Sequence, residues 1–180
     1  MRWEWKLNAS APLEIPAYLL LGSNIRPEVH LSQALDLLRQ RAQVFAVSRV
    51  WETPPVGTDG PLFYNAAVGI LTSLPPDALK RRLLRPIEAQ LGRVRTGDKF
   101  APRPIDIDLV VYASEVLDPE VWQYAHIAIP LSEILPDLRH PQTGEPLARY
   151  AARRAQEADC RPVAPPGWPT LSRPPRPSRA

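Results

Sequence analysis

The chain has 180 residues, of which 44% are apolar and 23% are charged. These proportions are typical of an ordinary soluble protein and predict one domain rather than two. The formal net charge is +3, and four arginines lie in residues 161–180, which contain no acidic residue. The positive charge therefore belongs largely to that segment, and a basic nucleic-acid-binding domain is not indicated.

The cysteine content and the longest apolar run exclude further classes. Cys160 is the only cysteine, which excludes an intrachain disulfide and a zinc site made of cysteines. Residues 1–6 lack the apolar run of a signal peptide, and residues 16–21 are too few to cross a bilayer. We therefore expect a cytoplasmic protein that is not inserted in a membrane.

The two ends of the sequence differ from the rest in composition. Residues 1–16 show no apolar periodicity and are interpreted as an N-terminal extension. Residues 161–180 contain seven prolines and four arginines, so little apolar burial would offset the entropy of ordering them, and we expect a disordered tail. The folded domain is predicted to span residues 17–160.

The first half of this domain predicts a strand, a helix and two further strands. The expected elements are a strand over 17–21, a helix from residue 27, strands over 44–51 and 63–71, and a loop over 52–61. The first strand is a short apolar run that ends at Gly22, and Pro27 suits the first turn of a helix. The loop is predicted from its prolines, which cannot donate to a strand ladder.

The second half predicts a helix and a strand, followed by shorter helical pieces. The expected elements are a helix over 75–91 kinked at Pro86, a strand over 105–112, and helical pieces after residue 130 and over 146–158. The order β-α-β-β-α-β is that of the ferredoxin-like split βαβ fold, an α+β class. We expect an antiparallel sheet with two helices on one face, plus the C-terminal helical pieces.

Two aspartates give the first chemical signal. Asp106 and Asp108 are two residues apart on a predicted strand, so both carboxylates project from the same face. Like charges that close favour a cation, and Mg²⁺ is commonly held by one or two carboxylates together with nucleotide phosphates. The alternative is an ordinary solvated face of a sheet.

A basic segment leads directly into the two aspartates. Its cations are Arg93, Arg95, Lys99 and Arg103, and only Asp98 opposes them. Arginine binds phosphate oxygens through two parallel hydrogen bonds, and lysine supplies a mobile point charge. Together with the carboxylate pair, this segment predicts a site for a nucleoside triphosphate.

Five segments in order carry a family resemblance. They are Leu21-Gly22-Ser23-Asn24, Glu52-Thr53-Pro54-Pro55-Val56-Gly57, Phe63-Tyr64-Asn65-Ala66, Ile87-Glu88 with Leu91-Gly92-Arg93-Val94-Arg95, and Ala101-Pro102-Arg103-Pro104-Ile105-Asp106-Ile107-Asp108-Leu109. From residue 17 to about 158 the chain closely resembles 6-hydroxymethyl-7,8-dihydropterin pyrophosphokinase of folate synthesis. The ferredoxin-like fold of that family agrees with the predicted order of elements.

The resemblance implies a reaction and residues that carry it. Diphosphate would pass from ATP to the hydroxymethyl oxygen of the pterin, releasing AMP, with two Mg²⁺ ions held by Asp106 and Asp108. Arg93 and Arg103 match the catalytic arginines of the family. The positions implied for nucleotide binding are Glu88, Arg95, Lys99, Leu109 and His126. No covalent nucleophile is required, because positioning and charge neutralisation suffice.

The resemblance also implies a pterin site. Its residues would be Gly22, Thr53, Pro54, Val56, Phe63 and Asn65. A pterin has a flat π-face and an edge of donors and acceptors, so an aromatic ring and an Asn amide are suitable partners. The expected partners are thus ATP and the pterin, with no nucleic acid and no membrane.

The sequence departs from the family between residues 112 and 130. This stretch is several residues short, and the second stacking Phe of the family has no clear counterpart. His126 stands either for the family's histidine near the nucleotide or for that Phe, while Trp122 and Tyr124 are the other candidate rings.

Two other functions remain open from sequence. A palm-like nucleotidyltransferase also places paired carboxylates on a ferredoxin-like sheet, but it would release diphosphate rather than AMP. A non-enzymatic ferredoxin-like binding module would leave the aspartates and their neighbouring cations unexplained.

Overall fold

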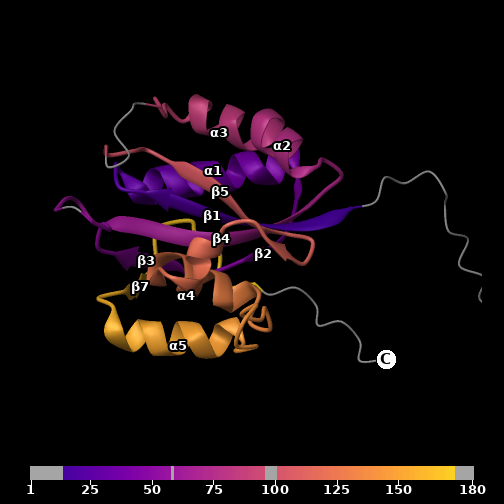
Figure 1. Cartoon of the computed structure of the whole chain (residues 1–180). Helices are drawn as coiled ribbons and strands as arrows, with labels where there is room; N and C mark the ends of the chain where they lie inside the picture. The colour runs from indigo at the N-terminus through magenta and orange to yellow at the C-terminus, as the bar shows by residue number, and fades with distance from the viewer. Residues whose placement is uncertain (1–13, 58, 96–100, 173–180) are drawn as a thin grey trace, which may run out of the picture.

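The computed structural model describes residues 14–57, 59–95 and 101–172. One sheet forms the middle layer, and helices cover both of its faces (Figure 1). The strands are β1 (Ile15–Ser23), β2 (Gln43–Val47), β3 (Val50–Thr53), β4 (Phe63–Thr72), β5 (Asp106–Tyr112), β6 (Glu115–Val116) and β7 (Arg161–Val163). Their order across the sheet is β6-β5-β1-β4-β3-β7, and β2 also pairs with β4. All of these pairings are antiparallel.

The first face carries the helices that the sequence predicted there. They are α1 (Pro27–Arg41) and a second helical run made of α2 (Pro76–Leu79), η1 (Lys80–Leu84) and α3 (Arg85–Gln90). Pro86 has no N–H to donate to the preceding turn, and the π-helical segment η1 lies immediately before α3. A π-helical turn therefore lies just before the proline at which a kink was predicted.

The second face is covered by helices whose position was not predicted. They are α4 (Ala125–Ile134), preceded by the short 3₁₀ helix η2 (Pro119–Trp122), and α5 (Leu147–Glu157). A helical piece was expected only after Pro130, but α4 begins at Ala125 and contains that proline. The apolar side chains of α4, among them Ile127 and Ile129, pack against the sheet in the core of this face.

Strand β1 lies in the middle of the sheet and is buried on both sides. Leu19 and Leu21 belong to the core beneath α1, whereas Tyr18 and Leu20 belong to the core beneath α4. A strand covered on both faces is a continuous apolar run rather than an alternating one. This double cover explains the run of apolar side chains from which the strand was predicted.

The strand predicted over residues 44–51 is interrupted. Ser48 leaves the regular ladder: its hydroxyl accepts a hydrogen bond from the Ala67 amide at 2.8 Å. The Arg49 amide donates instead to the Glu133 carboxylate of α4, at 2.8 Å. The break therefore separates β2 from β3 and ties both to the helix on the second face.

Regular structure extends past the expected bounds of the domain, residues 17–160, on both sides. Ile15 and Pro16 already belong to β1, where they pair with Thr72 and Leu71 of β4. Part of the segment expected to be a disordered tail forms β7, which pairs with the free edge of β3, and Ser172 pairs with Val47. Backbone pairing and a few apolar contacts thus fix a segment whose composition alone predicted no structure.

Among the described residues, no helix has both the length and the apolar character needed to cross a membrane.

Candidate active site

A cleft of about 280 Å³ opens at the end of the sheet where β1 ends and β5 begins. Its lining consists of Leu20, Gly22, Thr53, Pro54, Pro55, Val56, Phe63, Asn65, Arg103, Asp106, Asp108, Glu120, Tyr124 and His126. The strand register explains why these segments meet: Gly22 pairs with Asp106 on one side and with Asn65 on the other. The sheet therefore carries the carboxylate and the amide on the same row, one strand either side of Gly22.

Gly22 permits the close approach of Asn65. A Cβ atom at this position would lie 3.1 Å from the Asn65 side-chain oxygen, which is tighter than most real Cβ contacts. The sequence predicted Gly22 as the end of the first strand and as a position of the pterin site, and its structural role is to leave room for a side chain on the neighbouring strand.

Asp106 and Asp108 project from β5 on the cleft side, as predicted. Ile107 and Leu109 alternate with them and are buried on the opposite face. Burial raises the pKa of Asp108 to about 7, and the negative charges of Asp106 and Glu88 add to the shift. The carboxyl of Asp108 opens to the cleft, but the surrounding walls still limit its hydration, so its charged form is disfavoured without a cation.

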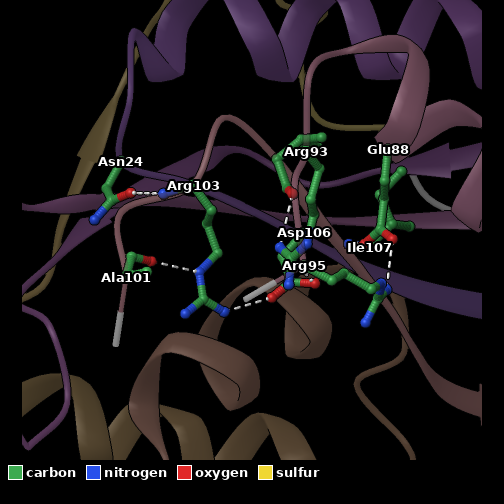
Figure 2. A network of polar contacts seen from close by, with 9 residues as sticks. Asn24, Glu88, Arg93, Arg95, Ala101, Arg103, Asp106 and Ile107 are labelled. Carbon is green, nitrogen blue, oxygen red and sulfur yellow. Dashed lines mark hydrogen bonds and ion pairs between the residues drawn. The ribbon is translucent and has the colours of Figure 1, made fainter. Parts of the chain in front are cut away.

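Two arginines contact Asp106, each at a different carboxylate oxygen (Figure 2). Arg93 lies 3.0 Å from one carboxylate oxygen and also donates to the Ile105 carbonyl at 2.8 Å. Arg103 donates to the other oxygen at 2.8 Å. Asp106, Asp108 and Arg103 line the cleft, whereas Arg93 is not among the lining residues and reaches it only through its contact with Asp106. We call these four residues the charged wall.

Asn24 fixes the backbone of Arg103. Its side-chain oxygen accepts a hydrogen bond from the backbone N–H of Arg103 at 2.7 Å, and the backbone N–H of Asn24 donates to the Arg103 carbonyl at 3.2 Å. The turn after β1 thus anchors the segment that carries this arginine (Figure 2). Asn24 belongs to the first of the five family segments, but the sequence analysis gave it no role of its own.

Glu88 lies behind β5 rather than in the cleft. It is 2% exposed and accepts hydrogen bonds from the Ile107 amide at 2.9 Å and from Arg95 at 2.6 Å. Burial raises its pKa, while these hydrogen bonds act against the shift. The carboxylate therefore fixes the peptide between the two aspartates and draws Arg95 toward β5.

The other predicted nucleotide positions are divided. Neither Arg95 nor Leu109 is among the described residues that line the cleft, and Leu109 packs in the core of the first face. Lys99 lies outside the described residues. His126 does line the cleft, but it faces it from α4.

The predicted pterin residues all line the cleft. Asn65 donates from its amide to the Thr53 hydroxyl at 2.8 Å, and both side chains are buried. Phe63, Pro54 and Val56 complete this side. We call Thr53, Phe63 and Asn65, with Tyr124 and His126 from α4 and its N-terminal end, the neutral wall.

The structure separates the three candidate rings. Tyr124 and His126 line the cleft with their ring centroids 5.5 Å apart and their planes inclined by 30°. Trp122 instead packs against Tyr150 and His140, with centroids 5.5 and 4.9 Å away. Burial lowers the pKa of His126 to about 4, so this ring is neutral at physiological pH.

Three lining residues were missed by sequence reasoning. Leu20 could have been found, because it is two residues before Gly22 on the same strand and shares its face. Pro55 lies between two predicted residues. Glu120 had no signal, since it reaches the cleft only through the packing of η2.

Two solved structures show the same fold as this chain. They are Plasmodium falciparum HPPK-DHPS, wild type with SDX-DHP, at TM-score 0.64, and the A437G form with SDX-DHP, at TM-score 0.66. Each is 12% identical; together they cover 82 and 83% of this chain and 46 and 47% of their own. At this identity the likeness shows the fold alone, and the chain spans just under half of each.

Curated relatives are more similar in sequence. The 2-amino-4-hydroxy-6-hydroxymethyldihydropteridine pyrophosphokinase of Methylorubrum extorquens is 41% identical over 134 residues, 68% of this chain and 84% of the relative. The protein of that name from Porphyromonas gingivalis is 34% identical and covers 72% of this chain and 96% of its own length. The folic acid synthesis protein fol1 of Pneumocystis carinii is 34% identical over 82% of this chain, which spans only 21% of that protein.

The fold, the cleft and these relatives place the chain among the pterin pyrophosphokinases. The model of the 7,8-dihydro-6-hydroxymethylpterin-pyrophosphokinase (HPPK) family matches residues 18–136, about two thirds of the sequence. The chain belongs to this family.

Proposed function

We propose that the chain transfers the pyrophosphoryl group of ATP to the hydroxymethyl oxygen of 6-hydroxymethyl-7,8-dihydropterin and releases AMP, as a step of folate synthesis. Family membership supports this activity. The observation that carries it is the row Asp106–Gly22–Asn65, which sets a charged wall and a neutral wall on either side of one cleft. A polyphosphate and a pterin have these two complementary characters.

The charged wall suits a magnesium-bound triphosphate. Asp106 and Asp108 supply hard oxygen ligands, and burial together with the neighbouring negative charges raises the pKa of Asp108, which supports a site that a cation completes. Among the described residues, no group of three or more ligating side chains could hold a metal on its own, so phosphate oxygens would complete the coordination. We propose two Mg²⁺ ions, which when bound neutralise the phosphate charge.

Arg93 and Arg103 are the proposed catalytic cations. In this structure both contact Asp106. Binding of Asp106 to a metal would withdraw its oxygens from the guanidinium groups, which would then donate to the phosphate oxygens of ATP. Arg95, held by Glu88, and Lys99 are proposed nucleotide contacts, whereas Glu88 and Leu109 would act through the position of β5.

The neutral wall suits the pterin. The Asn65 amide and the Thr53 hydroxyl offer donors and acceptors to the edge of the ring, and Phe63 offers a face for stacking. Tyr124 and His126 supply the second aromatic surface in place of the missing Phe. The neutral state of His126 favours this role over a contact with phosphate.

The strand order supports a finer description of the fold. If β2 and β3 are counted as one interrupted strand, the four main strands follow the order β5-β1-β4-β2/β3. That order and the antiparallel pairing are those of a ferredoxin-like sheet.

We also propose a cytoplasmic location. The single cysteine of the sequence supports it, because proteins of oxidising compartments often carry paired cysteines.

The proposed function is tested by incubating the full chain with Mg²⁺, ATP and 6-hydroxymethyl-7,8-dihydropterin. We expect AMP and a pterin diphosphate in equal amounts. Release of diphosphate with a nucleotidyl product would instead indicate the palm-like nucleotidyltransferase. Binding of either ligand with no consumption of ATP would indicate a binding module.

A further inference from the structure

The C-terminal segment from Arg161 to Ser172 lies along the edge of the sheet beside the neutral wall. Figure 1 shows β7 next to β3, on the far side of the sheet from β5. We call this segment the C-terminal strap. Among the residues that line the cleft none comes from the strap, so any influence on the reaction must pass through β3.

Strand β3 needs support because of its length and position. It has four residues and pairs with β4 on one side, through Trp51, Glu52 and Thr53. Its last residue, Thr53, is 2% exposed and holds the amide of Asn65. A strand this short with one free edge would fray, and Thr53 lies at the end that frays first.

The strap covers this free edge up to the residue before Thr53. Val163, Pro162 and Arg161 pair in turn with Val50, Trp51 and Glu52. The Arg161 guanidinium also donates to the Glu52 carboxylate, with Nε 2.5 Å from Oε1. The Glu52 side chain is 12% exposed, so this ion pair is shielded on the side of the carboxylate.

A second set of contacts holds the other end of β3. The Trp168 indole N–H donates to the Ser48 carbonyl at 2.9 Å. Ser172 and Val47 exchange backbone hydrogen bonds of 2.9 and 3.0 Å. These peptide groups belong to the break between β2 and β3, where the regular ladder is interrupted. The strap thus holds β3 at both ends.

We propose that the C-terminal strap positions Thr53 and the following loop for binding of the pterin, with Arg161 and Trp168 as its positioning residues. This inference rests on the proposed function, since it assigns the strap to the acceptor substrate of that reaction. Strands β4 and β1 lie between β3 and β5, the strand that carries Asp106 and Asp108, so we expect ATP binding to be independent of the strap.

The test uses the full chain with Arg161→Ala and, separately, Trp168→Phe, which removes the indole donor but keeps an aromatic ring. Each variant should raise the KM for the pterin about threefold to tenfold, the effect of one lost hydrogen bond or ion pair. The kcat at saturating pterin and the Kd for ATP should stay within about twofold of the unsubstituted chain.

Arg153→Ala is the matched control. It removes an arginine that makes a bidentate ion pair with Glu145 at 2.7 and 3.1 Å, on the helix farthest from the sheet. The pterin KM should not change. If Arg161→Ala and Arg153→Ala behave alike, or if ATP affinity falls as much as pterin affinity, the strap provides general stability and the inference is wrong.

A double-substitution cycle shows whether the strap acts through Thr53. Thr53→Ala removes the group that the strap is proposed to position, so adding Arg161→Ala should weaken pterin binding by less than it does alone. Fully additive losses would contradict the inference. If the unsubstituted chain releases no AMP, the proposed function itself fails, which is a different result from normal turnover with unchanged pterin KM in the strap variants.

Discussion

The two walls of the cleft differ in how far apart their residues lie in the sequence. The charged wall comes from residues 93–108, where ion pairs and the alternation of β5 set the geometry locally. The neutral wall joins β3 and β4 to residues 124–126, which reach the cleft only because α4 packs on the second face. The charged wall is therefore largely set within one segment of the chain, whereas the proposed acceptor site depends on tertiary packing.

The largest effect should come from the centre of the charged wall. Asp108→Asn should lower turnover by at least about a thousandfold, because metal binding contributes several kcal/mol of charge stabilisation. AMP release measures the loss. Thermal unfolding of the metal-free variant should occur at the same or a higher temperature, since the substitution removes repulsion with Asp106 and Glu88.

Near-normal activity of this variant would remove Asp108 from the metal site. A variant that fails to fold would instead make the aspartate pair structural and would erase the contrast between the two walls.

The next effect separates the arginines of the charged wall from a simple nucleotide contact. Arg103→Ala should lower kcat about a hundredfold with little change in the Kd for ATP, whereas Arg95→Ala should mainly weaken ATP binding. Asn24→Ala should reproduce a part of the Arg103 effect, because it releases the backbone of that residue. A rise in ATP Kd that accounts for the whole loss at Arg103 would make it a binding residue only.

The neutral wall should show smaller effects that are confined to one substrate. Tyr124→Ala and His126→Ala should each weaken pterin binding several-fold to about tenfold, because each removes a stacking partner. Titration of ATP without pterin should be unchanged. Trp122→Ala is the control, since this ring packs on Tyr150 outside the cleft and should affect unfolding more than pterin affinity. If His126→Ala weakens ATP binding instead, the His126 ring contacts the nucleotide rather than the pterin.

The smallest effect is a pH dependence of the charged wall. The pKa of Asp108 is raised to about 7, so the folded chain binds more protons than the unfolded chain between the ordinary pKa of Asp and about 7. The metal-free protein should therefore lose stability as the pH rises through this window. Mg²⁺ binding should weaken as the pH falls below 7 and should release a proton.

Calorimetric titration of Mg²⁺ in two buffers of different ionisation enthalpy measures that proton. The release should disappear in Asp108→Asn. Its persistence there would assign the titration to another group.

The local part of the site could be predicted from sequence. The period of two along a strand places Asp106 and Asp108 on one face of β5. The arginines near them were predicted because they lie in the segment that leads directly into this strand. The partner of a side chain could not be predicted when it comes from another element. Glu88 was expected to contact the nucleotide, yet its carboxylate accepts a hydrogen bond from the backbone N–H of Ile107. The apolar periodicity of a strand does not indicate which of its N–H groups donates to a side chain on a helix.

The fold was predictable to a similar limit. The order of strands and helices followed from apolar patterns, but the start of α4 did not, because Pro130 lies inside the helix rather than before it. The strap was missed for a related reason. The strap is ordered because it pairs with the open edge of β3, and the composition of a segment does not indicate whether such an edge is available elsewhere in the fold.

The link between Val47 and Ser172 also affects how the chain is made. These residues are 125 positions apart, so the contact cannot form until residue 172 has left the ribosome. The edge of β3 likewise stays open until residues 161–163 emerge to pair with it, and unpaired strand edges favour wrong association of nascent chains. The last described residues to be synthesised therefore close the sheet and end the period in which the new chain is most prone to aggregate.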